Sequence, residues 1–142
     1  MSRDSEVRSK LKEEVFALQS HEYDWNGTGG LPIRPDVFAM LNWLIPSFCF
    51  PDDRILFRLG VPQITLNDDG TVDWFWEYHN RSLNIRFLCS GSLKYGRFFE
   101  DNSMEVAGVL VNRSLSEINV RASALAQWVC TGVLQDPEVF TK

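Results

Sequence analysis

A few residues in this sequence are of the types that carry acid–base or metal chemistry. Glu77 and His79 are two positions apart, so on a strand they would lie on the same face. That pair could exchange a proton, but no nucleophile with an accompanying base is visible. His21, Glu22 and Asp24 could surround a metal ion with His79, yet two distant histidines without a spaced ligand pair do not make a ligand set. We therefore predict no catalytic residues, no metal site and no cofactor.

A glycine-rich segment, Asp24-Trp-Asn-Gly-Thr-Gly-Gly30, follows the first histidine. Such a segment could cradle a phosphate, but it lacks the Gly-Lys-Ser/Thr ending of a phosphate-binding loop, and no strand is predicted before it. We predict instead a tight loop in which Trp25 fills a hydrophobic groove. Ligand binding by this loop is the alternative. Its candidate residues are Asp24, Trp25, Asn26, Gly27 and Gly29.

The elements that must position these residues begin with an antiparallel β-meander over residues 62–100, where apolar and polar residues alternate. A three-residue loop with Gly70 in the left-handed conformation would pair Leu66 with Val72 and Ile64 with Trp74. This register keeps the apolar residues on one face, whereas a slip of one residue would reverse them.

The second turn is expected around Asn80-Arg81, with His79 opposite Ser82. The strands on either side then share one apolar face, on which cross-strand pairs stabilise the sheet. The expected pairs are Tyr78 with Leu83, Trp76 with Ile85 and Trp74 with Phe87. A fourth strand follows Ser90-Gly-Ser92, and Arg97 interrupts its apolar face, so we expect it at an edge of the sheet. A fifth strand is expected around Val106–Val111.

Helices are predicted at both ends of the chain. Residues 5–20 show helical periodicity and could be capped by Asp4 or Ser5. A second helix should begin at Pro35 and be ended by Pro46 and Pro51. The last should begin after Ser114, which has capping-box spacing to Glu117, and should end at Gly132. The segment Ile55–Leu59 is predicted to be extended, and residues 1–4 and 135–142 to be mobile.

Together these elements predict an α+β fold: an antiparallel meander of four to five strands, with two N-terminal helices and a C-terminal helix packed on it. At 142 residues the chain matches the usual size of one domain, so residues 1–142 are expected to form a single domain. The start of the chain has no apolar core of a signal peptide, and no stretch approaches a membrane span. The three cysteines have no close spacing and are expected to be free thiols. We expect a cytoplasmic protein that does not enter the membrane.

Charge narrows the range of partners. The formal net charge is −5, without a basic patch able to neutralise several phosphates, so nucleic acid is not an expected partner. The second face of the meander should carry polar residues around an aromatic anchor, Phe75, and such faces suit protein recognition. Most sheet faces of this kind are simply solvated and linked by ion pairs. The candidate partner-binding residues are Asp73, Phe75, Glu77, His79 and Arg86.

Two parts of the sequence carry a resemblance. The loop Asp24-Trp-Asn-Gly-x-Gly-x-x-Pro32, and the hairpin Asp69-Gly-x-Val72 followed by a Trp76-Glu77 strand, resemble those of a set of small uncharacterised bacterial proteins. That set shares an Asp-Trp-(Asp/Asn)-Gly-x-Gly-x-x-Pro loop and an Asp-Gly-x-(Ile/Val) hairpin. The resemblance covers about residues 23–87 and implies no activity.

These observations favour a non-enzymatic accessory or regulatory protein that binds a protein partner. We also expect a role in a defence-type operon. This expectation comes from the general type of small bacterial protein and not from any residue of this sequence. A homodimeric structural subunit is the first alternative, because edge strands and unpaired aromatic side chains favour self-association. The second is a small enzyme with a cleft near Trp25, Glu77, His79 and Arg86.

Overall fold

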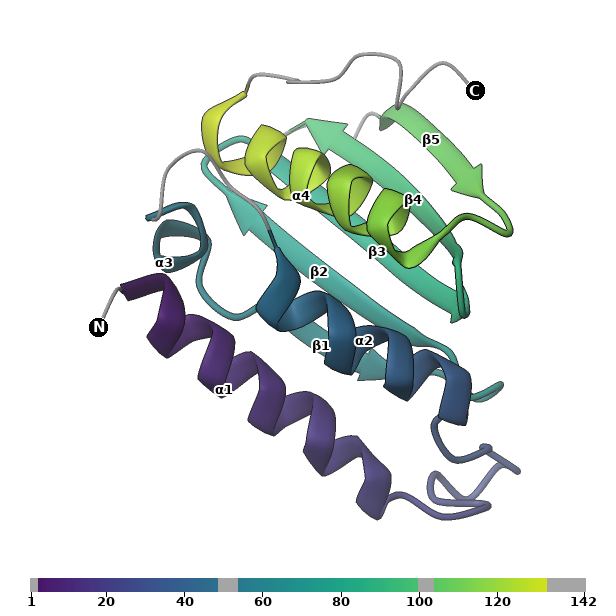
Figure 1. The fold of residues 1–142 in the computed structure, drawn as a ribbon. Helices are drawn as coiled ribbons and strands as arrows, with labels where there is room; N and C mark the ends of the chain where they lie inside the picture. Colours follow the sequence, from purple (N-terminus) through teal and green to yellow (C-terminus); the bar gives the residue numbers. More distant parts are fainter. Residues whose placement is uncertain (1–2, 49–53, 100–103, 133–142) are drawn as a thin grey trace.

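The structure, a computed structural model, describes residues 3–48, 54–99 and 104–132. It has the predicted α+β class, with helices at both ends of the chain and a five-stranded antiparallel sheet between them (Figure 1). The helical elements are α1 (Arg3–Ala17), a short 3-10 helix (Leu18–Ser20), α2 (Pro35–Ser47), α3 (Ile55–Leu59) and α4 (Leu115–Thr131). The strands are β1 (Gln63–Leu66), β2 (Val72–Tyr78), β3 (Arg81–Cys89), β4 (Ser92–Phe99) and β5 (Met104–Leu110).

The strands follow one another across the sheet in the order β1-β2-β3-β4-β5, which confirms the meander. The first hairpin has the predicted register, with Ile64 opposite Trp74 and Leu66 opposite Val72. Gly70 adopts the expected left-handed conformation, with φ of 84°. The expected fifth strand is confirmed as β5.

The register predicted for the second hairpin is wrong by two residues. The observed pairs are Tyr78 with Arg81, Trp76 with Leu83 and Trp74 with Ile85. The turn is displaced by one residue: the two-residue loop is His79-Asn80 rather than Asn80-Arg81, and His79 takes φ of 56° there. A shift of two leaves every side chain on its predicted face. Trp74 and Trp76 therefore point inward as expected, with exposed fractions of 0% and 3%.

The prediction that β4 is an edge strand is wrong. β4 lies between β3 and β5, and the edges of the sheet are β1 and β5. Arg97 occupies an apolar position without ending the sheet, because its guanidinium lies 4.8 Å from the ring centre of Trp128 on α4. This cation–π contact accommodates the charge in an environment where Arg97 is only 2% exposed.

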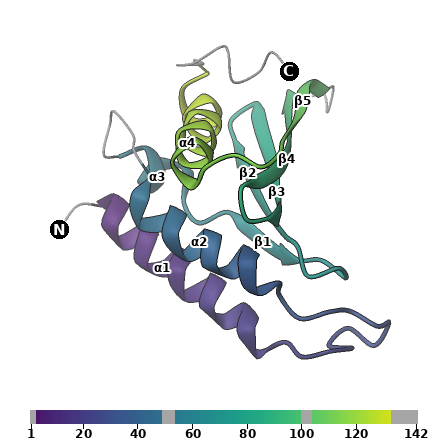
Figure 2. The same ribbon diagram turned by 45° about the vertical axis from the view of Figure 1, so that its right-hand side comes forward.

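All the described helices lie on one face of the sheet, which we call the inner face (Figures 1 and 2). α4 packs on β2 and β3, and α2 packs on β3, while α1 packs on α2 and α3. Ser114 caps α4 by accepting a hydrogen bond from the Glu117 N–H, and Gly132 ends the helix in the left-handed conformation, both as predicted. Ile55–Leu59 is a short helix rather than an extended segment.

The start of α1 also differs from prediction. α1 begins at Arg3, ahead of the proposed caps Asp4 and Ser5, so these two residues lie within the helix. α2 ends at Ser47, between Pro46 and Pro51, the two prolines expected to end it. Of the terminal segments expected to be mobile, residues 1–2 and 135–142 lie outside the described residues.

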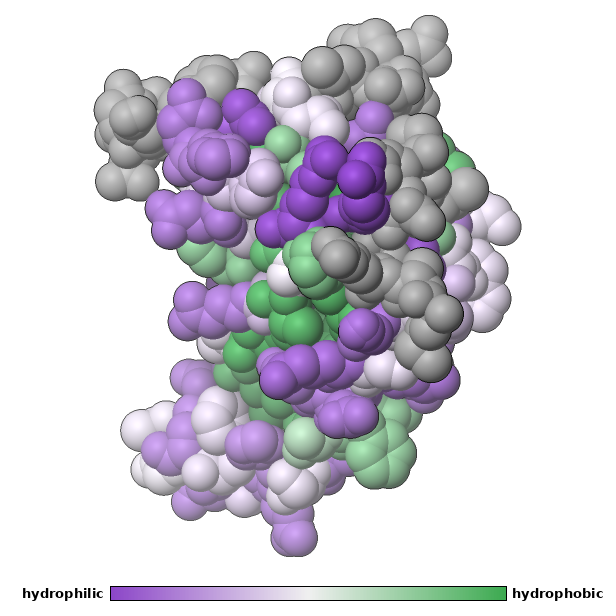
Figure 3. All heavy atoms as spheres, turned by 90° about the vertical axis from the view of Figure 1, so that its left-hand side faces the viewer, coloured by the Kyte–Doolittle hydropathy of each residue, from purple (hydrophilic) through white to green (hydrophobic). Residues whose placement is uncertain are grey.

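A single cluster of buried apolar side chains joins the inner face of the sheet to α1, α2 and α4. Apolar side chains also reach the surface on the side of the molecule that carries α3 (Figure 3). On α3 itself Phe57 is exposed. In the described part of the chain, no helix is both long enough and apolar enough to cross a membrane.

Candidate functional site

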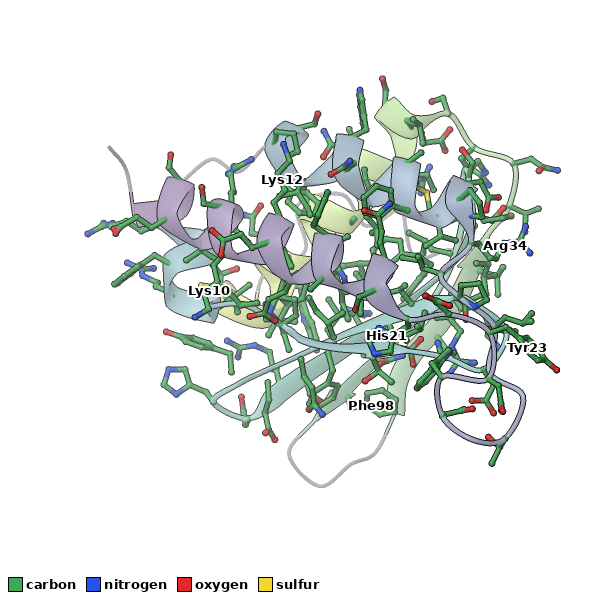
Figure 4. All side chains as sticks on the ribbon, turned by 90° about the horizontal axis from the view of Figure 1, so that it is seen from below. Lys10, Lys12, His21, Tyr23, Arg34 and Phe98 are labelled. Carbon is green, nitrogen blue, oxygen red and sulfur yellow. The ribbon has the colours of Figure 1, made fainter. Side chains whose placement is uncertain are left out.

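The face of the sheet opposite the helices carries the predicted recognition residues, and we call it the outer face. Figure 2 shows the helices gathered on one side of the strands, and Figure 4 shows Phe98 on the far side of the sheet from Lys12 of α1. The alternation of side chains along the paired strands defines the outer face. Its residues on β2 to β5 are Asp73, Phe75, Glu77, Ser82, Asn84, Arg86, Lys94, Gly96, Phe98, Ala107 and Val109.

An ion pair between adjacent strands organises one part of the outer face. Asp73 lies directly opposite Arg86, and the guanidinium donates from Nε at 2.7 Å and from Nη2 at 3.1 Å to the two carboxylate oxygens. The amide of Asn67 also donates to Asp73, at 2.9 Å. The hydrogen bond with Asp73 raises the pKa of Arg86. The sequence allowed this pair, but as a diagonal contact rather than a directly opposite one.

The other predicted partner-binding residues lie apart from this ion pair. Glu77 lies opposite Ser82, towards the far end of β2, and is exposed. His79 lies in the hairpin loop, where its ring meets that of Tyr78 at a centroid distance of 4.3 Å. Phe75 lies opposite Asn84 and is half-buried. The structure therefore brings Asp73, Phe75 and Arg86 together and leaves Glu77 and His79 towards one end.

A shallow depression of about 240 Å³ lies beside Arg86 on β3, β4 and β5. It exists because Gly96 has no side chain and its cross-strand neighbour is the small Ala107. The ring of Phe98 lies over Gly96, where a Cβ atom would meet it at 3.0 Å. The lining residues are Asn84, Arg86, Lys94, Tyr95, Gly96, Phe98 and Ala107.

The sequence reasoning did not single out the β4 residues of this depression. Lys94, Gly96 and Phe98 alternate with inward-facing residues of β4, and that alternation was the available signal. Pairing with β3 places Lys94 directly opposite Arg86, and Gly96 directly opposite Asn84.

The glycine-rich loop is closed on itself rather than open to a ligand. Asp24 Oδ1 accepts from the Gly29 N–H at 2.7 Å, and Asn26 Oδ1 accepts from the N–H groups of Thr28 and Gly30 at 3.0 and 2.9 Å. The Gly27 N–H donates to the Asp24 carbonyl at 3.1 Å. Four successive N–H groups that could have held a phosphate are thus already hydrogen-bonded within the loop. The geometry therefore favours a tight structural loop over a phosphate-binding loop.

Trp25 anchors this loop, as predicted. Its indole Nε1 donates to the Leu31 carbonyl at 2.7 Å, and its ring packs against the edge of the core. The His21 ring meets it edge-on at a centroid distance of 5.3 Å.

The loop is also joined to the β1–β2 hairpin. The Leu31 N–H donates to the Asp68 carbonyl at 2.8 Å, and the Arg34 N–H donates to the Gly70 carbonyl at 3.0 Å. Gly70 has no room for a side chain, because a Cβ atom would lie 2.6 Å from the Pro32 carbonyl oxygen. The two segments that carry the sequence resemblance therefore form one structural unit.

The four residues of the enzyme alternative do not converge. Trp25 lies beside the hairpin that precedes β2, whereas Glu77 and His79 lie at the other end of that strand. From Thr71 to His79 the chain advances about 26 Å at the rise of an extended strand. Over the described ranges, no three His, Cys, Asp or Glu side chains gather to hold a metal ion.

A buried polar group under α4 was also absent from the sequence prediction. Arg97 lies against Trp128, and Tyr95 on the same face of β4 extends over Gly108 of β5. Burial raises the pKa of Tyr95, and the charges of Arg97 and Arg121 oppose that shift. At the end of α4, the Arg81 guanidinium donates to the carbonyls of Val129 and Cys130 at 3.0 and 3.2 Å. These contacts connect the helix to the sheet.

Comparison with protein-family models, with curated proteins and with solved structures found no match to this chain. The candidate site therefore rests on the geometry of the chain itself.

Proposed function

We propose that this protein is a non-enzymatic binding module that holds a protein partner on the outer face of its sheet. One observation carries the proposal: a five-stranded sheet keeps a whole face free of the described helices, and that face mixes aromatic, apolar and charged side chains. Phe75, Phe98 and Arg86 belong to residue types that are enriched at protein interfaces.

The size of the face sets the kind of complex we expect. Five strands about 4.8 Å apart and about seven residues long present a flat area of roughly 550 Å². A standard interface buries about 800 Å² on each partner. The outer face alone therefore suits a small or transient complex, and adjoining loops would have to contribute to a stable one.

Site-specific photocrosslinking in cells of the source organism tests this proposal. A photoreactive amino acid is placed at Lys94 or Val109 on the outer face and, as a control, at Lys12 on α1. All three positions are exposed. We expect one crosslinked protein from the outer-face positions alone, identified by mass spectrometry. Equal crosslinking from α1 would count against the proposal.

The identified partner is then purified and its affinity measured by calorimetry. Val109→Asp on the outer face and Val120→Asp on α4 are matched variants, because both side chains are 53% exposed. We expect Val109→Asp to weaken binding by roughly tenfold or more, as burial of an unpaired charge does, and Val120→Asp to leave it unchanged. The reverse order would place the interface on the helical side.

A second candidate is self-association through β5. Among the strands that the structure describes, β5 pairs only with β4, so it forms one edge of the described sheet. Val109 and Val111 beside that edge are exposed. Light scattering over a range of concentrations separates the two candidates, because a monomer at high concentration would remove the second and leave the first.

A further inference from the structure

We propose that the depression at Gly96 is the specificity pocket of the outer face, and that it receives one carboxylate carried on an extended segment of the protein partner. The acidic side chain would lie between Lys94 and Asn84, with a neighbouring apolar side chain against Phe98. This inference rests on the proposed function, because it names the chemistry of the partner that binds the same face.

One cation at the depression, Lys94, has no ion-pair partner among the described residues. Arg86 and Lys94 are directly opposite on adjacent strands, an arrangement in which like charges repel. Asp73 compensates Arg86 through two hydrogen bonds. No described carboxylate forms an ion pair with Lys94, whose side chain is exposed beside the depression. One carboxylate of a partner could pair with this ammonium group.

Hydrogen-bonding capacity on the floor of the depression supports the same ligand. The side-chain amide of Asn84 is half-buried, and among the residues that the structure describes it has no hydrogen-bond partner. The Arg86 Nη1 group lies on the same guanidinium whose other two nitrogens bind Asp73. A carboxylate has two oxygens and can accept from an ammonium and an amide together.

The shape of the depression accounts for the apolar part of the proposed segment. Phe98 forms one wall and Ala107 another, while Val109 extends the apolar surface beside Lys94. A volume of about 240 Å³ fits one or two side chains rather than a cofactor. Gly96 keeps the space open, because a side chain there would meet the Phe98 ring.

A single-stranded nucleic acid is the alternative ligand for this face, because its bases stack on aromatic side chains and its phosphates are negatively charged. The outer face carries two cations, Arg86 and Lys94, and two carboxylates, Asp73 and Glu77, and Asp73 already pairs with Arg86. The chain as a whole has a net charge of −5. Binding to single strands depends on several phosphate contacts, so these charges favour a single carboxylate on a protein.

Selection from a phage-displayed library of random heptapeptides tests the pocket. The library is selected on the full chain and counter-selected on Lys94→Glu, and enriched peptides are measured by fluorescence polarisation. We expect an Asp or Glu at one fixed position beside an apolar residue. Replacing that acid by its amide should weaken binding roughly tenfold, the effect of one charge-assisted hydrogen bond.

Matched variants of the protein show which residues bind the acidic peptide. Lys94→Glu should reduce affinity at least as much as the amide peptide does, and Lys12→Glu, the same charge change on α1, should leave it unchanged. Gly96→Ala should also weaken binding, because the Phe98 ring must move. Thermal unfolding of each variant shows that it is folded. Failure to enrich an acidic position, or equal effects of Lys94→Glu and Lys12→Glu, would overturn the inference.

An oligothymidine measured in parallel separates the polymer classes. Binding of that probe with loss in Lys94→Glu would assign the pocket to phosphates and overturn the inference. The photocrosslinking experiment tests the proposed function separately from the pocket. Outer-face crosslinks to a protein that binds without an acidic segment would remove the inference and leave the proposed function standing. Absence of such crosslinks would remove the proposed function.

Discussion

The side-chain amide of Asn26 donates a hydrogen bond of 2.5 Å to the carboxylate of Asp68, although 42 residues separate them in the chain. The same Asn26 accepts from the Thr28 and Gly30 N–H groups. One side chain therefore closes the glycine-rich loop and joins it to the β1–β2 hairpin. The loop is an ordered part of the fold because of this contact.

Exchanging the two side chains tests that contact. Asn26→Asp places two carboxylates against each other and should reduce the free energy of unfolding by roughly 2 kcal/mol at pH 7. Asp68→Asn alone keeps an acceptor for the Asn26 amide and should cost less. The double variant restores one donor and one charged acceptor, so it should recover most of the loss in urea denaturation. Strictly additive effects would show that the two side chains do not interact.

Gly70 and Gly27 give a matched pair of glycine substitutions. Both have positive φ, of 84° and 79°, so alanine at either position carries a backbone cost of about 1–2 kcal/mol. A Cβ atom at Gly70 also meets the Pro32 carbonyl oxygen at 2.6 Å, whereas one at Gly27 meets nothing within 4 Å. Gly70→Ala should therefore lower the free energy of unfolding by about 1–3 kcal/mol more than Gly27→Ala. Equal denaturation midpoints would contradict the packing between loop and hairpin.

Two core tryptophans differ in the hydrogen bonding of their indole groups. Trp76 Nε1 donates to the Gly60 carbonyl at 2.9 Å, whereas Trp74 Nε1 is buried with no hydrogen-bond acceptor within the described part of the chain. Phenylalanine removes the N–H in both cases, but only at position 76 does it break a hydrogen bond. Trp76→Phe should thus be more destabilising than Trp74→Phe by about 1 kcal/mol. Chemical denaturation measures both, and a larger loss for Trp74→Phe would contradict this assignment.

The ionisation of Asp69 makes the stability of the fold depend on pH in the acidic range. A hydrogen bond from the Thr71 side chain, assisted by the Thr71 N–H, lowers the pKa of the Asp69 carboxyl against the opposing effect of burial. Because the pKa of Asp69 is lower in the folded than in the unfolded protein, its ionisation stabilises the fold at pH values above the unfolded-state pKa of about 3.9. This contribution is lost as the pH falls through the folded-state pKa. The stability difference between the wild type and Thr71→Val should therefore be constant at neutral pH and decrease below about pH 4.

Carboxyl-carbon NMR titration provides the direct measurement for Asp69. Its pKa should lie below the ordinary Asp value in the wild type and move back towards it in Thr71→Val. An Asp69 that titrates at its ordinary pKa in both proteins would exclude this source of acid sensitivity.

Local patterns in the sequence determined most of the elements and their faces. Alternation placed Trp74 and Trp76 inward, and capping residues marked both ends of α4 correctly, because these signals act between near neighbours in the chain. One error arose from the same local basis. Ile55–Leu59 was too short and too uniformly apolar for its periodicity to distinguish helix from strand.

Tertiary contacts decided the rest. The two-residue loop at His79 set the second register, and Arg81 then reached the carbonyl end of α4, a contact that no local rule contains. Arg97 appears in the sequence as an interruption, and no local rule predicts its cation–π contact with Trp128, 31 residues later. The depression at Gly96 likewise requires three strands in register. Periodicity determines which face a side chain takes, but its neighbours on that face depend on pairing between distant segments, which the packed core alone selects.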